Sequence, residues 1–200
     1  WHATWRALGV GTADDAEFAS LLQRYDEPHR AYHTRRHLAE CFAHWDGVRA
    51  QSERPGEVEL ALWYHDAVYD PRRDDNEALS AALACEAILR ADLSESVAAR
   101  VTDLVLATQH ADVPATGDAA LLVDVDLAIL GASAERFDEY EREVRREYAW
   151  VPGPVFRWKR RAILEALVKR PQLYATEHFQ RIAESQARAN LRRSVVQLGG

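Results

Sequence analysis

The chain has 200 residues, of which 48% are hydrophobic and 28% are charged, and its formal net charge is −7. This length suits one domain whose core is large enough to fold without disulfides or structural zinc. The acidic balance argues against binding to a nucleic acid polymer, which depends on Lys and Arg neutralising phosphates, but it permits a small phosphorylated ligand. No apolar run approaches the ~20 residues of a membrane span, so we expect no membrane contact.

The two cysteines, Cys41 and Cys85, form no CxxC pair, and each lies in an apolar helical pattern. We interpret them as buried free thiols in a reducing compartment. The N-terminal residues 1–6 show no apolar signal-peptide segment. Together these features favour a cytoplasmic location.

Apolar residues recur at helical spacing along the chain, and no segment alternates as a strand does. We therefore predict an all-α fold, a single bundle of about eight or nine helices. The expected helices cover residues 13–25, 33–51, 56–69, 75–91, a segment opening at Ser94, 121–130, a segment opening at Ser133, 155–170 and 176–196. Thr12, with Asp15 three residues later, predicts the start of the first helix. Pro and Gly residues mark the main breaks, including a loop at 112–118.

Two histidines, His33 and His37, lie four positions apart near the start of the expected helix 33–51. Residues four apart share one face of an α-helix, so such a helix would place both imidazoles on one side. Two histidines at the polar start of a helix, one of them a cap, also need no function. The pair therefore indicates a metal site only when it is considered together with the later motifs.

His65 and Asp66 stand inside the expected helix 56–69, which is apolar nearly all round and is predicted to be a buried central helix. A buried carboxylate beside an imidazole is costly unless it is charge-paired or binds a metal. A His–Asp hydrogen bond without a metal is the alternative explanation.

Asp124 and Asp126 lie in the expected helix 121–130, and apolar residues flank both of them on their own faces. Two such carboxylates need a nearby cation unless one of them faces solvent, which we expect of one. Histidines and aspartates from three helices therefore predict a divalent metal site. Nitrogen and oxygen ligands suit Mn, Fe, Co, Ni or Zn, with Mg as a further candidate. An incomplete protein shell leaves room for water and substrate, which is typical of a catalytic site.

The order H…HD…D resembles the HD superfamily of metal-dependent phosphohydrolases, and most closely a subgroup of short bacterial proteins within it. The similarity runs through residues 25–33, 63–70, 75–77, 124–131, 145–148 and 187–191. It implies one HD-type domain over residues 1–200. It also implies that His65 and Asp66 are metal ligands, and that Asp126, which precedes a leucine, is the last ligand in preference to Asp124.

The segment 32–37 is similar to the YHxxxH segment of cyclic-nucleotide phosphodiesterases, which share the HD core. That likeness implies that His37 is a metal ligand and that His33 donates a proton to the leaving oxygen. The present chain is much shorter, and Tyr69 stands where those enzymes carry a histidine. Cyclic-nucleotide specificity is therefore not carried over.

Several other polar residues are candidates for binding substrate or a second metal. Asn76 and Glu77 follow the His65–Asp66 helix and either orient a metal-bound water or cap the next helix. His110 stands where some two-metal HD proteins have an extra histidine, although a favourable charge at a helix end explains it equally well. Candidates for holding phosphate are Arg30, Arg145 and Tyr148, together with one of the arginines in 157–161. For any single arginine, a solvated surface position is the commoner role.

We expect a metal-dependent phosphohydrolase that acts on a small phosphorylated metabolite such as a nucleotide. In this hypothesis Asp66 holds the metal and orients the water nucleophile, and His33 protonates the leaving group. Two alternatives stay open. One is a di-iron oxygenase of the HD type, for which the extra donors would be His110, Glu77 and Asp124. The other is a non-catalytic regulatory module that binds metal or nucleotide. The substrate, the metal and the oligomeric state, including a homodimer, are not determined by the sequence.

Overall fold

The computed structural model describes residues 1–110 and 116–199, and within these ranges the chain is all-helical and contains no strand. The predicted all-α class is confirmed, although the described residues form eleven α-helices, slightly more than the expected eight or nine. The α-helices are α1 (His2–Ala7), α2 (Asp15–Tyr25), α3 (Arg35–Asp46), α4 (Pro55–Tyr64), α5 (Asn76–Arg90), α6 (Glu95–Ala107), α7 (Gly117–Asp126), α8 (Ala134–Glu147), α9 (Gly153–Lys169), α10 (Glu177–Ile182) and α11 (Glu184–Gly199). Two 3₁₀ helices, η1 (Arg49–Gln51) and η2 (Leu127–Gly131), complete the described elements. Most of the expected loop 112–118 falls on residues 111–115, outside the described residues.

Side-chain caps explain where several helices begin. Ser94 and Ser133 cap α6 and α8 as expected. The first long helix begins later than predicted, because Asp14 rather than Thr12 is its N-cap. The Asp14 carboxylate accepts hydrogen bonds from the amides of Ala16 and Glu17 at 2.8 and 3.2 Å. Each cap satisfies amides that the first helical turn leaves unpaired.

The expected helix 176–196 is divided into α10 and α11 at Ala183. Gly131, at the end of η2, lies against this break so closely that a Cβ built on it would stand 2.7 Å from the Ala183 Cβ. This close approach explains why glycine suits position 131, and it ties the end of η2 to the α10–α11 corner.

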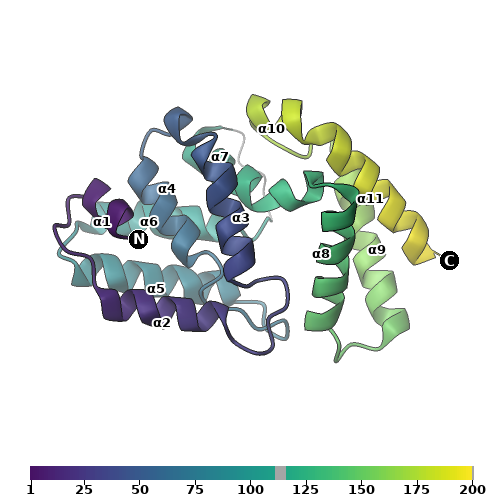
Figure 1. Cartoon of the computed structure of the whole chain (residues 1–200), viewed down its shortest axis with the longest axis horizontal. Helices are drawn as coiled ribbons and strands as arrows, with labels where there is room; N and C mark the ends of the chain where they lie inside the picture. Colours follow the sequence, from purple (N-terminus) through teal and green to yellow (C-terminus); the bar gives the residue numbers. More distant parts are fainter. Residues whose placement is uncertain (111–115, 200) are drawn as a thin grey trace.

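Helix α4 lies at the centre of the fold and is surrounded by α1, α3, α5, α6 and α7 (Figure 1). Its residues Val58, Leu60, Ala61, Leu62 and Tyr64 are completely buried. The predicted central position of this segment is confirmed. A helix buried on nearly every side is expected to be mostly apolar, and the two buried acids of α4, Glu57 and Glu59, are paired with Arg100 and Arg49.

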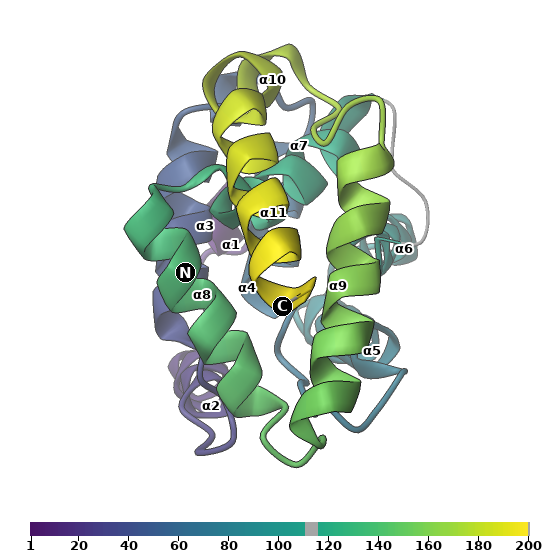
Figure 2. The ribbon, with the colours of Figure 1, turned by 90° about the vertical axis from the view of Figure 1, so that its right-hand side faces the viewer.

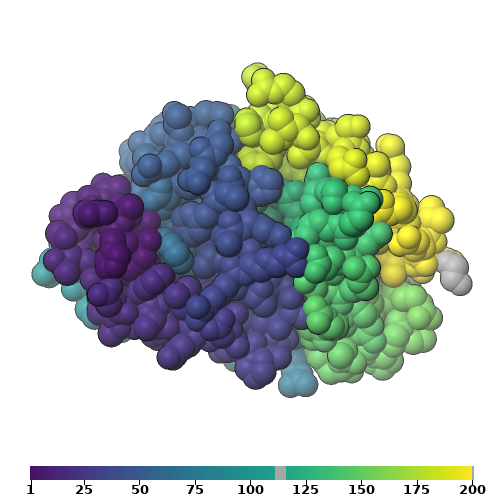
Figure 3. All heavy atoms as spheres, in the orientation of Figure 1, coloured from purple at the N-terminus to yellow at the C-terminus, as the bar shows by residue number. Residues whose placement is uncertain are grey.

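The C-terminal helices α8, α9 and α11 stand beside this core and, seen from their side, in front of α4 and α7 (Figure 2). The space-filling view shows the N-terminal and C-terminal parts in contact where α3 meets α8 (Figure 3). Ion pairs of Arg36 with Glu139 and of Arg136 with Glu40 join these two helices. No helix in the described ranges is long and apolar enough to cross a bilayer.

Candidate metal centre and the adjoining cavity

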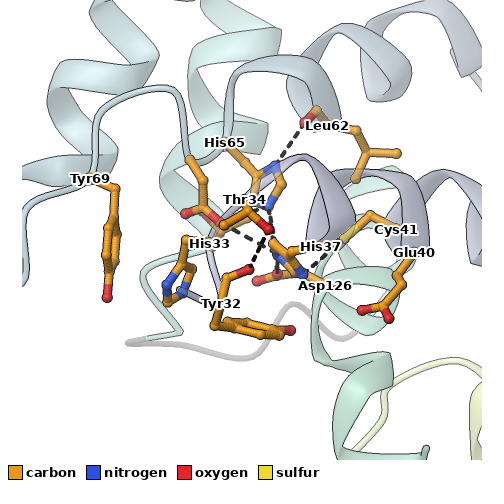
Figure 4. Close-up of polar contacts among 12 residues, drawn as sticks. Tyr32, His33, Thr34, His37, Glu40, Cys41, Leu62, His65, Tyr69 and Asp126 are labelled. Atoms are coloured by element: carbon orange, nitrogen blue, oxygen red, sulfur yellow. Dashed lines mark hydrogen bonds and ion pairs between the residues drawn. The ribbon is translucent and has the colours of Figure 1, made fainter. Parts of the chain in front are cut away.

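Four predicted side chains from three parts of the fold meet at one point. His37 comes from α3, His65 and Asp66 directly follow α4, and Asp126 is the last residue of α7. The two imidazole Nε2 atoms lie 3.2 Å apart. Oδ2 of Asp66 lies 3.4 Å from Nε2 of His37 and 3.2 Å from Nε2 of His65. Oδ1 of Asp126 lies 3.1 and 3.7 Å from the same two nitrogens. Figure 4 shows His37, His65 and Asp126 turned toward one another.

These separations fit a divalent metal ion. Metal–ligand bonds of about 2.0–2.2 Å place neighbouring donor atoms about 2.9–3.5 Å apart in octahedral or tetrahedral coordination. The five donor–donor distances given above run from 3.1 to 3.7 Å. Only small side-chain movements are therefore needed to bind one ion.

The tautomer of His65 is also suited to metal binding. Its Nδ1 lies 2.8 Å from the carbonyl oxygen of Leu62, and a carbonyl can only accept. Nδ1 therefore carries the proton, and the lone pair of Nε2 points at the cluster. A hydrogen bond of this kind fixes both the tautomer and the ring orientation of a metal-binding histidine.

The pKa values of the cluster residues also indicate that the cluster suits a bound cation. Burial disfavours the charged form of His65, but the adjacent Asp66 carboxylate raises the pKa of His65 well above its ordinary value. Burial likewise opposes ionisation of Asp66, and the His65 imidazole holds the pKa of Asp66 well below its ordinary value. The buried carboxylates thus require positive charge beside them, which either protons or a divalent cation can provide.

Cys41 belongs to the same cluster. Its Sγ and the donor atoms of His37, His65 and Asp126 all lie within 4.8 Å of one another. The sulfur is 3.7 Å from both ring nitrogens of His37, so it does not lie along the lone pair of either one. Sequence reasoning identified a buried thiol and missed its neighbours, although its spacing of four residues from His37 was the available signal.

Helix α4 ends at Tyr64, and the expected extension of this helix to residue 69 is wrong. His65 keeps helical angles as the C-cap, and the chain then turns away. The Arg30 guanidinium donates to the carbonyl oxygens of Asp66, Ala67 and His33 at 2.7, 3.1 and 3.1 Å. Arg30 thus satisfies the carbonyl oxygens of Asp66 and Ala67 just beyond the end of α4, and so stabilises the turn that carries Asp66. Arg30 therefore joins two site-bearing segments, and its position gives no support to the predicted phosphate-binding role.

His33 and His37 do not share a helix face, so that expectation is also wrong. The N-cap of α3 is Thr34, which leaves His33 in the preceding turn. The His33 ring is 5.9 Å from the His37 ring and stacks on Tyr69 at 4.0 Å, outside the metal cluster. The two histidines therefore have different surroundings.

Glu147, the last residue of α8, positions His33. Its Oε1 accepts the backbone amides of Ala31, Tyr32 and His33 at 2.8, 2.7 and 3.0 Å. Its Oε2 lies 2.8 Å from both His33 Nδ1 and the Tyr69 hydroxyl. Burial alone would raise the pKa of Glu147, but the hydrogen bonds from the His33 ring and these amides lower it to about 2.

This carboxylate is ionised at neutral pH and can only accept, so His33 carries a proton on Nδ1. The second ring nitrogen, Nε2, is left for chemistry. Sequence reasoning missed Glu147, although it follows Phe137, Tyr140 and Val144 at spacings of ten, seven and three residues on the buried face of α8.

The structure separates Asp126 from Asp124. Asp124 is fully buried, but its carboxylate accepts from the amides of Ala175 and Thr176 at 2.9 and 2.7 Å and from the Thr176 hydroxyl at 2.6 Å. It thus anchors the start of α10. The expectation that one of the two aspartates faces solvent is wrong, because amides rather than a cation or water satisfy Asp124.

His110 lies on the other side of Asp126. Its Nε2 is 3.0 Å from Asp126 Oδ2, while Oδ1 of the same carboxylate faces His37. His110 has a positive φ of 55°, which turns the chain at the end of α6 and directs the ring inward. A helix-end charge alone does not account for this contact.

A cavity of about 710 Å³ adjoins the cluster, and its wall includes His33, His110 and Asp126. Asn76, Glu77 and Tyr148 of the predicted substrate-binding residues also line it. Asn76 additionally bonds both backbone groups of Asp70, at 3.0 Å each, and so holds the loop before α5.

Arg145 is not brought to this cavity. Its guanidinium donates to the carbonyl oxygens of Tyr148 and Val151 at 2.5 and 3.2 Å, at the turn between α8 and α9. Arg160, from the run 157–161, does line the cavity. It lies beside the Tyr140 hydroxyl at 2.8 Å and is paired with Glu141.

No family model, curated protein or solved structure matches this chain. The likeness to the HD superfamily therefore depends on the motif residues themselves. The structure adds that His37, His65 and Asp126 meet with Cys41 in an all-helical fold, in a cluster compatible with a metal site. Asp66 lies beside the two histidines of this cluster.

Proposed function

We propose that this protein is a metal-dependent phosphohydrolase of the HD type, acting on a small phosphorylated metabolite. The observation that carries the proposal is the convergence of His37, His65, Asp66 and Asp126 beside a cavity whose wall includes Asp126 and His33. A cavity of this volume is within the common range for small-molecule sites.

Each residue has a distinct task in this proposal. The four converging side chains would hold a divalent cation, which, when bound, would lower the pKa of water and withdraw charge from a phosphoryl group. Asp66, the ligand held in place through Arg30, would also orient the attacking water.

His33 is suited to protonate the leaving oxygen from Nε2. Its ring is held on Nδ1 by Glu147 and packed against Tyr69. The hydrogen bond from Nδ1 to the Glu147 carboxylate holds the ring both before and after Nε2 gives up its proton. General-acid catalysis of this kind contributes about 10²–10⁴ in rate.

The test is a screen of phosphate esters and anhydrides with the protein loaded separately with Mn, Fe, Co, Ni, Zn and Mg. We expect turnover in wild type, loss of metal binding and turnover in His65→Ala, and metal binding without turnover in His33→Ala. His44→Ala is the matched control, because His44 lies on α3 but is exposed. Equal turnover in wild type and His65→Ala would refute the proposal.

A two-metal centre, as the di-iron alternative requires, is a second candidate. It is favoured by the contact of His110 with the free oxygen of Asp126 and by Glu77 in the same cavity. Asp124 does not contribute, because it anchors α10. Metal analysis decides between the candidates. Two equivalents of bound metal per chain in wild type, both lost in His110→Ala, would indicate the dinuclear site.

A further inference from the structure

The end of α9 brings a second arginine, Arg170, to the cavity. We infer that Arg170 binds the phosphoryl group of the substrate, and that the cavity accepts a single phosphate attached to an apolar or aromatic body. This inference deepens the proposed function and rests on it for the identity of the reacting group.

Arg170 lines the same cavity as Asp126, a member of the metal cluster. Its Nη2 is 3.5 Å from the backbone oxygen of His110, whose ring contacts the Asp126 carboxylate at 3.0 Å. An anion beside Asp126 would therefore lie within reach of the guanidinium. Because the guanidinium presents parallel N–H donors, it matches a phosphate oxygen pair better than a point charge does.

One nitrogen of the Arg170 guanidinium, Nη1, is buried and has no hydrogen-bond acceptor among the described residues. A buried donor without an acceptor is costly, and such groups are concentrated at functional sites. The backbone here is held by Arg188, which donates to the carbonyl oxygens of Val168, Arg170 and Pro171 at 3.2, 2.9 and 2.8 Å. The guanidinium is thus attached to a fixed point of the wall.

The charges around the cavity favour one phosphate rather than several. Arg160 is paired with Glu141, and Arg73 donates to both oxygens of Asp75 at 2.7 and 2.6 Å. Asp74 and Glu77 add negative charge to the same wall. A di- or triphosphate would bring more anionic oxygens than the wall has uncommitted cations, and the two acids would repel the excess.

The rest of the wall suits an apolar or aromatic body. Ile163 and Leu167 of α9 and Leu127 and Ile129 of η2 line the same cavity, together with tyrosines that include Tyr140 of α8. Only Leu164 of α9 is fully buried by protein, so the cavity-facing side of this helix has apolar groups left for a ligand. Rings can stack on tyrosine faces within such a wall.

The first test measures binding of inorganic phosphate to the Mn²⁺-loaded protein by calorimetry. We expect Arg170→Gln to weaken phosphate binding by about ten- to a hundredfold, as the loss of charge-assisted hydrogen bonds predicts. Arg170→Lys should weaken phosphate binding by an intermediate factor, because lysine keeps the positive charge but lacks the paired N–H donors of the guanidinium. Arg161→Gln is the matched control on the same helix, since Arg161 is exposed and paired with Glu165.

Unchanged phosphate affinity in Arg170→Gln, equal losses in the control, or no phosphate binding by wild type overturns the inference. Circular dichroism and the thermal midpoint verify that each variant is folded. If Arg170→Gln does not fold, the phosphate affinity of Arg170→Lys decides the test. If Arg170 controls phosphate binding while no ester is hydrolysed, the proposed reaction fails and this inference stands.

The second test compares adenosine mono-, di- and triphosphate and glycerol 3-phosphate as competitors of phosphate. We expect the monophosphate to bind at least about tenfold more tightly than the triphosphate, which the two wall acids repel, and than glycerol 3-phosphate, which lacks the ring. Tighter binding of the triphosphate, or equal binding of glycerol 3-phosphate and the nucleoside monophosphate, overturns the assignment of the substrate class.

Discussion

Replacing Glu147 with glutamine tests the part of the site that sequence reasoning missed. The carboxylate accepts five hydrogen bonds, three from the amides of residues 31–33 and two from the side chains of His33 and Tyr69. A glutamine keeps one carbonyl oxygen for the amides, but it presents an NH₂ group to His33 Nδ1. His33 must then give up the proton on Nδ1, and its charged form loses its partner.

The stability that the Glu147 carboxylate contributes follows from its pKa, which is about 2 in the folded protein and 4.5 ordinarily. This difference corresponds to about 3 kcal/mol of stability at neutral pH. The side chain is 0% exposed, so screening by solvent does not reduce it. Because the folded pKa is the lower one, the contribution is complete above the ordinary value and is lost as the pH falls through the folded one. By pH 3 less than half of it remains, about 1.4 kcal/mol.

The assay is urea unfolding of wild type and Glu147→Gln at pH 7, 5, 4 and 3. We expect the difference in unfolding free energy to be near its full value at pH 7 and 5 and to shrink below pH 4. Glu165→Gln is the control, since an exposed ion pair such as that of Glu165 with Arg161 is worth about 0–1 kcal/mol. A difference below about 1 kcal/mol at pH 7, or one that does not vary with pH, would refute the reasoning.

Three further predictions concern the metal ligands and their support. Asp126→Asn should weaken Zn²⁺ binding at least about tenfold, whereas Asp124→Asn should leave Zn²⁺ affinity unchanged and lower the unfolding free energy by about 1–3 kcal/mol; similar losses of Zn²⁺ affinity would contradict the assignment. The Co²⁺-loaded protein should show no sulfur-to-cobalt charge-transfer band if Asp66 is the ligand, since its Oδ2 lies 3.4 Å from His37 Nε2 and the Cys41 sulfur lies 3.7 Å from the same atom. A band that disappears in Cys41→Ser and persists in Cys85→Ser would place the sulfur on the metal instead. Arg30→Lys should lower the unfolding free energy by about 2 kcal/mol or more, because lysine cannot reach three carbonyls at once; weaker binding of inorganic phosphate with unchanged stability would instead restore the predicted phosphate-binding role.

Local signals in the sequence were sufficient for most of the helices and for the candidate metal ligands. The apolar spacing within 56–64 required a buried helix, and a helix buried on all sides cannot carry His65 and Asp66 at its end without a partner for their charge. Capping residues such as Ser94 and Ser133 marked helix starts, because their side chains bond amides only two or three residues away.

What the sequence by itself determined about this protein is its all-α class, its central helix and the candidate ligands His37, His65, Asp66 and Asp126. These depend on periodicity, capping and the cost of burying charge, which act over a few residues. The tertiary structure alone decided three matters. Asp124 anchors α10 instead of binding metal, His33 is held by Glu147 from 114 residues away, and Arg170 reaches the cavity from the end of α9. Each depends on which distant backbone or side-chain groups lie opposite a given residue, and no local pattern encodes that pairing.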